Sequence, residues 1–168
     1  MVIIEDTRNQ IGKHKNINEQ LIALGHRVVR SKLYAGDYAK AVDQSVCIDT
    51  KQGLQEVASN LTQQHARFRA ECIRAQEVGI KLVILIEEPG IGGVMDVENW
   101  VNPRLVRWCK IRNAQAKGKS KNIKIPKLPP VNGERLMKAM ITMTDKYGVE
   151  WAFCSKDRTG AEIVRLLT

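Results

Sequence analysis

Residues 36–53 read GDYAKAVDQSVCIDTKQG, a stretch in which the charged residues Asp49 and Lys51 directly follow an apolar run. The pattern predicts a β-hairpin that turns at residues 43–45 and returns through SVCIDTK. Asp37 lies at the start of the first strand and Asp49 near the end of the second, so the hairpin brings two carboxylates near each other. Side chains alternate along a strand, which places Lys51 on the same face as Asp49. Because like charges in proximity cost free energy, this cluster needs an offsetting charge.

Hydrophobic periodicity on both sides of the hairpin predicts alternating strands and helices. The run IKLVILIEE is apolar nearly throughout, which is typical of a strand covered on both faces. We expect strands at residues 1–6, 27–33, 34–42, 45–51, 80–88 and 149–155, and helices at 16–25, 54–78 with a break at 62–64, 133–148 and 159–168. This order predicts an α/β fold with a mixed central sheet flanked by helices.

Composition narrows the class of protein. The chain has 168 residues, of which 43% are hydrophobic, which fits one domain with a real core (1–168). No apolar run approaches the roughly 20 residues that cross a bilayer, and we expect no membrane association. The four cysteines are scattered singly, so a zinc site or disulfide framework is not indicated. We expect a reducing compartment, the cytoplasm of a bacterial or phage-infected cell or a eukaryotic nucleus.

Positive charge is concentrated in one segment. The formal net charge is +9, and the segment 99–133 contains nine Lys and Arg residues and no acid. Such a block favours a polyanionic partner, because neutralised phosphates release counterions; a solvated basic loop is the structural alternative. The surrounding segment 89–132 has poor periodicity and is predicted to be a basic insertion, partly flexible at 114–124. Its Trp100 and Trp108 either stack on exposed bases or pack the insertion.

The hairpin acids suit a particular chemistry. Two carboxylates and a neighbouring backbone carbonyl form a hard-oxygen site for Mg²⁺, which keeps few protein ligands and several waters. A lysine beside such an ion can position or deprotonate a water, as phosphodiester hydrolysis requires. Taken alone, the alternation of Asp49 and Lys51 is more often a surface ion pair.

Several stretches together resemble the XPF-type nuclease domain of the PD-(D/E)xK superfamily. VIIEDTR resembles the opening strand of that family, GDY its second acidic motif, and VCIDTK its Glu-Arg-Lys strand. HARFRAEC and KLVILIEE resemble the helix and strand that follow, and VEWAFCSKDRTGAEIVRLL resembles the last strand and helix. The likeness covers residues 1–88 and 134–168 but not the basic segment between them.

This resemblance implies a restriction-endonuclease-like fold and a set of site residues. Asp37 and Asp49 are expected to hold Mg²⁺, for which Mn²⁺ can substitute, with the backbone carbonyl of Thr50 as a further ligand. Lys51 is expected to orient the attacking water, and Asp6 is an accessory acid.

Helix residues after the metal motif extend the expected site. Arg67 is expected to contact the scissile phosphate, and Glu71 to orient Lys51 or a water. Their spacing of four places them on one helical face, with Arg74 one turn further, although a helix-surface ion pair has the same spacing. Arg8 either contacts phosphate or pairs with a neighbouring acid.

The chain also departs from the family pattern. Asp49 replaces the usual Glu, and Asn9 replaces an acid that often follows the first motif. The tandem helix-hairpin-helix module of the family does not follow, which suits a stand-alone phage or prophage protein, so the basic segment is expected to bind DNA. The predicted DNA-binding residues are Arg8, Arg67, Arg74, Arg104, Arg107, Lys110, Arg112, Lys117, Lys119, Lys121 and Lys124.

The sequence therefore predicts a Mg²⁺-dependent DNA endonuclease that acts on branched, flapped or junction DNA. A homodimer, or a partner protein that supplies further DNA binding, is expected. Two alternatives remain open: a non-catalytic DNA-binding subunit of a nuclease complex, and a dimer resembling Holliday-junction resolvases.

Overall fold

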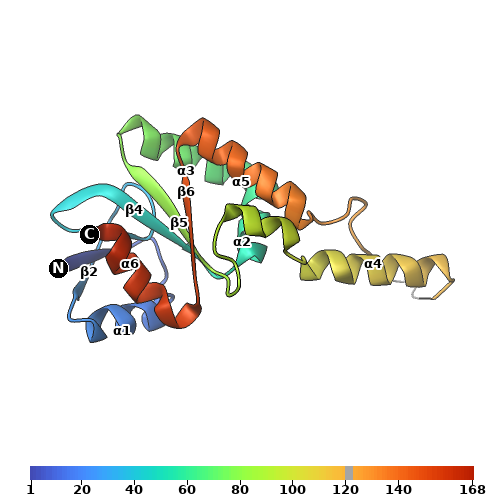
Figure 1. The fold of residues 1–168 in the computed structure, drawn as a ribbon, viewed down its shortest axis with the longest axis horizontal. Coiled ribbons are helices and arrows are strands. Elements are labelled where there is room, and N and C mark those ends of the chain that lie inside the picture. Colours follow the sequence, from blue (N-terminus) through green and yellow to red (C-terminus); the bar gives the residue numbers. More distant parts are fainter. Residues whose placement is uncertain (120–122) are drawn as a thin grey trace.

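A six-stranded mixed sheet, with strand order β2-β1-β3-β4-β5-β6, forms the centre of the protein (Figure 1). The structure, a computed structural model, describes residues 1–119 and 123–168. The strands are β1 (Val2–Asp6), β2 (Arg27–Ser31), β3 (Tyr38–Lys40), β4 (Asp43–Lys51), β5 (Lys81–Glu87) and β6 (Glu150–Cys154). Neighbouring strands are parallel except β3, which runs antiparallel to both β1 and β4. The predicted α/β fold with a mixed, helix-flanked sheet is confirmed.

Helices cover both faces of this sheet. They are α1 (Lys15–Ala23), α2 (Leu54–Thr62), α3 (His65–Glu77), α4 (Pro103–Ala116), α5 (Gly133–Tyr147) and α6 (Thr159–Leu167), with 3₁₀ helices η1 (Val94–Asn99) and η2 (Lys156–Arg158). Helices α1 and α6 lie against one face, and α2, α3 and α5 against the other (Figure 1). No described helix combines the length and the hydropathy that a membrane-spanning segment needs.

Strand β5 explains the apolar run in the sequence. Leu82, Ile84 and Ile86 enter the core under α2, α3 and α5, whereas Val83 and Leu85 enter the core under α1 and α6. All five are nearly inaccessible to solvent. A strand whose two faces both pack in a hydrophobic core has no polar face, so apolar and polar residues do not alternate in its sequence.

The hairpin differs from its prediction at the turn. The turn lies at residues 41–42, and the predicted turn, residues 43–45, lies at the start of β4. The register between β3 and β4 shifts between Ala39 and Lys40, so an irregularity closes the hairpin early. The pairing at the other end agrees with the prediction, because Tyr38 pairs with Ile48 and the amide of Asp37 donates to the Ile48 carbonyl at 2.7 Å.

The segment between β5 and α5 contains a helix that periodicity did not predict. Helix α4 has no buried residue and projects from the body of the protein (Figure 1). Its apolar side chains, Leu105, Trp108 and Ile111, are only half-buried, so α4 turns no apolar face to the core of the domain. Buried Asn102 closes the base of the segment: its Oδ1 accepts from the amide of Arg104 at 2.9 Å, and its Nδ2 donates to the Val131 carbonyl at 2.6 Å.

Candidate active site

Three acids from neighbouring strands meet at one end of the sheet. Asp6 ends β1, Asp37 immediately precedes β3, and Asp49 lies near the end of β4. All three are at least nine-tenths buried as residues, yet each lines a cleft of about 400 Å³. The cleft lies on the sheet face covered by α2 and α3, since Asp49 follows the same alternation as Cys47, a core residue of that face.

This cleft brings together most of the residues predicted from the sequence. Helix α3 supplies the cations and the acid predicted to follow the metal motif. The predicted residues that line the cleft are Asp6, Arg8, Asp37, Asp49, Lys51, Arg67, Glu71 and Arg74.

Asp37 is held by hydrogen bonds to both carboxylate oxygens. Thr50 donates to Oδ2 from its amide at 2.9 Å and from its hydroxyl at 2.7 Å, and Asn9 donates to Oδ1 at 2.9 Å. Burial alone raises the pKa of this carboxyl, but the Thr50 and Asn9 bonds outweigh it and lower the pKa below its ordinary value. Asp37 is therefore a fixed, ionised carboxylate.

The surroundings of Asp49 raise the pKa of its carboxyl, in contrast to Asp37. Burial, reinforced by the charges of Asp37 and Glu71, raises the pKa of its carboxyl to about 7 although Lys51 opposes the shift. The Lys51 ammonium lies 2.6 Å from Oδ2 of Asp49, yet that buried oxygen receives no hydrogen bond of good geometry. Burial lowers the pKa of Lys51, but the carboxylate of Asp49 outweighs burial and raises it. The pair is an ion pair that leaves Asp49 incompletely satisfied.

Asp6 and Arg8 form an ion pair at the rim of the cleft. Asp6 Oδ2 contacts the Arg8 guanidinium, and Asp6 Oδ1 accepts from the amide of Leu33 at 3.2 Å. The side chain of Arg8 remains 44% exposed, so the pairing leaves it accessible from the cleft. The structure shows the ion pair of Arg8, and its contact with phosphate stays a prediction.

Glu71 and Arg67 lie one turn apart on α3 but do not pair with each other. Glu71 Oε1 accepts a hydrogen bond from the amide of Gly36 at 3.1 Å, and Arg67 forms no ion pair within residues 1–119 and 123–168. Glu71 thus anchors the turn before Asp37, and its expected role in orienting Lys51 or a water stays a prediction.

Asp37 and Asp49 are the residues of the cleft that could hold a divalent cation. Within the described part of the chain, no group of three or more Asp, Glu, His or Cys side chains is placed to hold a metal. Mg²⁺ needs fewer, because it keeps several waters. Oδ2 of Asp49 accepts no hydrogen bond of good geometry, but the Lys51 ammonium lies 2.6 Å from it, so a divalent cation at this oxygen would displace that ammonium. The carbonyl of Thr50 as a further ligand stays a prediction.

Sequence reasoning missed the groups behind Asp37. His14 is buried, lies 3.9 Å from Asp37 Oδ2 and 3.5 Å from the Thr50 hydroxyl, and burial lowers its pKa so that it is neutral. Asn9, recognised only as a departure from an acid, donates to Asp37. An Asn or a Thr near an acid is too common in sequences to be a signal.

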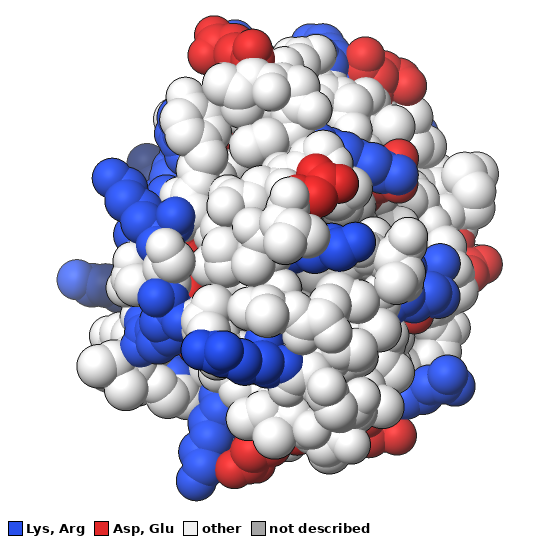
Figure 2. Space-filling view, turned by 90° about the vertical axis from the view of Figure 1, so that its left-hand side faces the viewer, with Lys and Arg blue, Asp and Glu red and all other residues white. Residues whose placement is uncertain are grey.

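The predicted basic residues beyond Arg74 lie away from the cleft. Helix α4 carries Arg104, Arg107, Lys110 and Arg112, followed by Lys117, Lys119 and Lys124. Lys121 lies outside the described residues. At the end of the molecule that bears both termini, Lys and Arg are interspersed with Asp and Glu (Figure 2). This agrees with the sequence, in which acids and bases balance outside the basic segment.

Comparisons with known proteins identify the fold. No family model and no curated protein matches the sequence. XPF from Aeropyrum pernix in complex with DNA matches with a TM-score of 0.59 and 18% identity, over 99% of this chain and 62% of that chain. The chain has a fold similar to that of XPF. A second structure, XPF from Aeropyrum pernix, matches with a TM-score of 0.53 and 16% identity, over 96% of this chain and 62% of that chain.

Proposed function

We propose that this protein is a metal-dependent endonuclease that hydrolyses phosphodiester bonds in branched, flapped or junction DNA. The observation that carries the proposal is the cleft in which fixed Asp37, incompletely satisfied Asp49 and Lys51 lie together. A buried cluster of this kind is unfavourable for folding alone, and such clusters concentrate at functional sites.

The two aspartates would hold Mg²⁺, or Mn²⁺ in its place, with the Thr50 carbonyl as a further ligand. When bound, the ion supplies positive charge beside a phosphoryl group and makes water a stronger acid. Asp37 binds as a preorganised anion, because Thr50 and Asn9 already fix its orientation.

The remaining cleft residues position the substrate. Lys51 is held beside Asp49 and can orient a water that enters the cleft. Arg67 and Arg74 line the same cleft from α3 and can contact phosphate oxygens. Glu71 acts indirectly, by holding the Gly36 amide and with it the position of Asp37.

Charge and the fold comparison support DNA as the partner. The XPF structure that matches over 99% of this chain was solved with DNA. Helix α4 and the residues around it present a block of exposed cations, which suits contact with the phosphate backbone. The homodimer expected from the sequence is a further part of the proposal, and sedimentation at micromolar concentration tests it.

A non-catalytic DNA-binding subunit is the second candidate. It is favoured by the Asp49–Lys51 ion pair, which offsets charge in the cleft without any metal. A resolvase-like dimer shares the chemistry of the first candidate and differs in substrate.

Incubation with labelled flap, fork, four-way and linear DNA, with and without Mg²⁺, separates these candidates. The nuclease proposal predicts Mg²⁺-dependent cleavage near the branch of flap or fork DNA. Cleavage restricted to four-way DNA supports the resolvase-like dimer. Binding without cleavage of any substrate contradicts the nuclease proposal and supports the non-catalytic subunit.

A further inference from the structure

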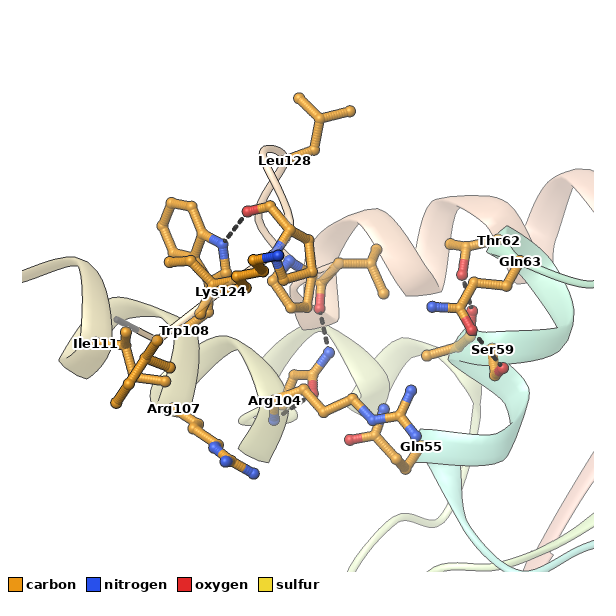
Figure 3. Close-up of a pocket in the computed structure, with 17 residues that line it drawn as sticks. Gln55, Ser59, Thr62, Gln63, Arg104, Arg107, Trp108, Ile111, Lys124 and Leu128 are labelled. Atoms are coloured by element: carbon orange, nitrogen blue, oxygen red, sulfur yellow. Dashed lines mark hydrogen bonds between the residues drawn. The ribbon is translucent and has the colours of Figure 1, made fainter. Parts of the chain in front are cut away.

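A second cavity, of about 430 Å³, lies between α2, α4 and the chain at residues 123–131 (Figure 3). Two hydrogen bonds hold its outer wall: Trp108 Nε1 donates to the Pro126 carbonyl at 2.9 Å, and Gln115 donates to the Ile123 carbonyl at 2.7 Å. We call this cavity the α2–α4 groove. Because its walls are tied together, it is a formed feature of the fold.

Apolar side chains form most of the lining of this groove. They come from α2, α4 and the extended chain that returns to α5, and Ile123 and Leu128 among them are exposed. The apolar lining residues are Ala58, Trp108, Ile111, Ile123, Ile125, Pro126, Leu128, Pro130 and Val131. Exposed apolar surface of this kind marks a binding site for a ligand or partner.

Only cations and neutral polar groups complete the lining. Arg104, Arg107 and Lys124 line the groove, and no Asp or Glu does so. Within the described part of the chain, none of these three cations forms an ion pair, and all are exposed. Figure 3 shows Arg104 extending from α4 toward Gln55 of α2. The charge of the groove therefore complements an anion.

Helix α2 connects this groove to the catalytic cleft. Its Gln55 and Ser59 line the groove, whereas Glu56 and Asn60 line the cleft. The two sets lie on different faces of one helix, at about 100° per residue. The groove and the cleft therefore lie on neighbouring faces of α2.

We propose that the α2–α4 groove binds a single-stranded DNA segment, with bases against the apolar wall and phosphates at Arg104, Arg107 and Lys124. Sites for single strands combine these two features, because every base has a face that packs on apolar or aromatic surface. The cavity volume lies within the range of about 300–1,000 Å³ for small-molecule pockets, which is large enough for an unpaired base. This proposal rests on the proposed function, which supplies DNA as the class of ligand. It adds that the groove holds the single strand that extends from a branch point.

Equilibrium binding in EDTA tests this proposal without any contribution from cleavage. The probes are a labelled oligothymidine, an abasic oligonucleotide of equal length and a blunt duplex. The double variant Arg104→Gln/Lys124→Gln removes two exposed groove cations. Lys110→Gln is the matched control, because Lys110 lies on the same helix but does not line the groove.

We expect the double variant to bind oligothymidine about tenfold more weakly and the duplex only slightly more weakly. The slope of log affinity against log salt for the single strand should fall by about 0.7 for each lost contact. Lys110→Gln should change both affinities by the same small factor, and the abasic strand should bind wild type about tenfold more weakly than oligothymidine.

Two results would overturn the proposal. Equal effects of the double variant on single strand and duplex mean that the groove cations act as general surface charge. If the abasic strand and oligothymidine bind with equal affinity, the apolar wall contacts no bases. A protein partner is then the better candidate for this wall. Neither result bears on cleavage, so the groove and the nuclease proposal fail separately.

Discussion

The backbone amide of Gly36 donates a hydrogen bond of 3.1 Å to Oε1 of Glu71. This bond ties helix α3 to the turn immediately before Asp37. Gly36 has φ of +71°, and a Cβ there would lie 2.9 Å from the carbonyl oxygen of Ile48. Helix α3 therefore fixes the position of a predicted metal ligand through backbone that only glycine fits.

Two substitutions of Glu71 distinguish the effect of this hydrogen bond from the effect of the side-chain charge. Glu71→Gln keeps a carbonyl that accepts from Gly36, whereas Glu71→Ala leaves the amide without its partner. We expect Glu71→Ala to lower the free energy of unfolding by about 1–3 kcal/mol and to slow cleavage, with Glu71→Gln much closer to wild type. Urea denaturation and initial cleavage rates measure both effects. If the two variants are equally impaired, the charge matters and the anchor does not.

Gly36→Ala tests the close approach of the turn to β4. The positive φ alone costs about 1–2 kcal/mol for alanine, and contact with the Ile48 carbonyl adds to it. Gly12→Ala is the matched control, because Gly12 has φ of +83° but no heavy atom within 4 Å of the added Cβ. Urea denaturation should show the larger loss of stability for Gly36→Ala. Equal losses would mean that the turn can move away from β4.

Metal binding should depend on pH through Asp49. The pKa of its carboxyl in the folded protein is about 7, above the roughly 3.9 of an unfolded chain. Its contribution to stability is therefore complete below the unfolded value and is lost as the pH rises through the folded value. A divalent cation competes with the bound proton.

We therefore expect Mn²⁺ to raise the melting temperature more at about pH 8 than at about pH 6. Calorimetric scans with and without Mn²⁺ measure the difference, and Asp49→Asn should remove it. An equal Mn²⁺ effect at both pH values, or one that survives in Asp49→Asn, would contradict a site at this carboxyl.

Arg67 is predicted to contact phosphate from the wall of the cleft. Arg67→Ala should weaken DNA binding in EDTA and lower the salt slope for duplex DNA by about 0.9, the value for one lost phosphate contact. Arg135→Ala is the control, since Arg135 is also exposed at a helix but does not line the cleft. Fluorescence anisotropy over a range of salt concentrations measures both. A slope unchanged by Arg67→Ala would place the phosphates elsewhere.

The sequence was informative where local pattern and burial coincide. The alternation Asp49-x-Lys51 and the two-faced run of β5 follow from strand geometry, so their positions could be predicted. The helical break at residues 62–64 is also confirmed, by the ends of α2 and α3. These features depend on neighbours along the chain.

Other features depend on contacts that are distant in sequence. The Gly36–Glu71 bond and the hydrogen bond from Asn9 to Asp37 join segments that only the folded sheet brings together. Helix α4 was missed because none of its residues is fully buried, and the α2–α4 groove exists only because the chain folds back from it. Exposed elements leave little trace in hydrophobic periodicity.

The most direct test of the account compares Mg²⁺-dependent cleavage of a labelled flap DNA by the wild-type protein and by Asp49→Asn. This substitution keeps the size of the side chain and removes the charge that a divalent cation requires. We predict cleavage by the wild type only with Mg²⁺, and a rate at least about a hundredfold lower for a folded Asp49→Asn protein. Wild-type cleavage in EDTA, or full activity of Asp49→Asn, would contradict a metal-dependent nuclease centred on Asp37 and Asp49.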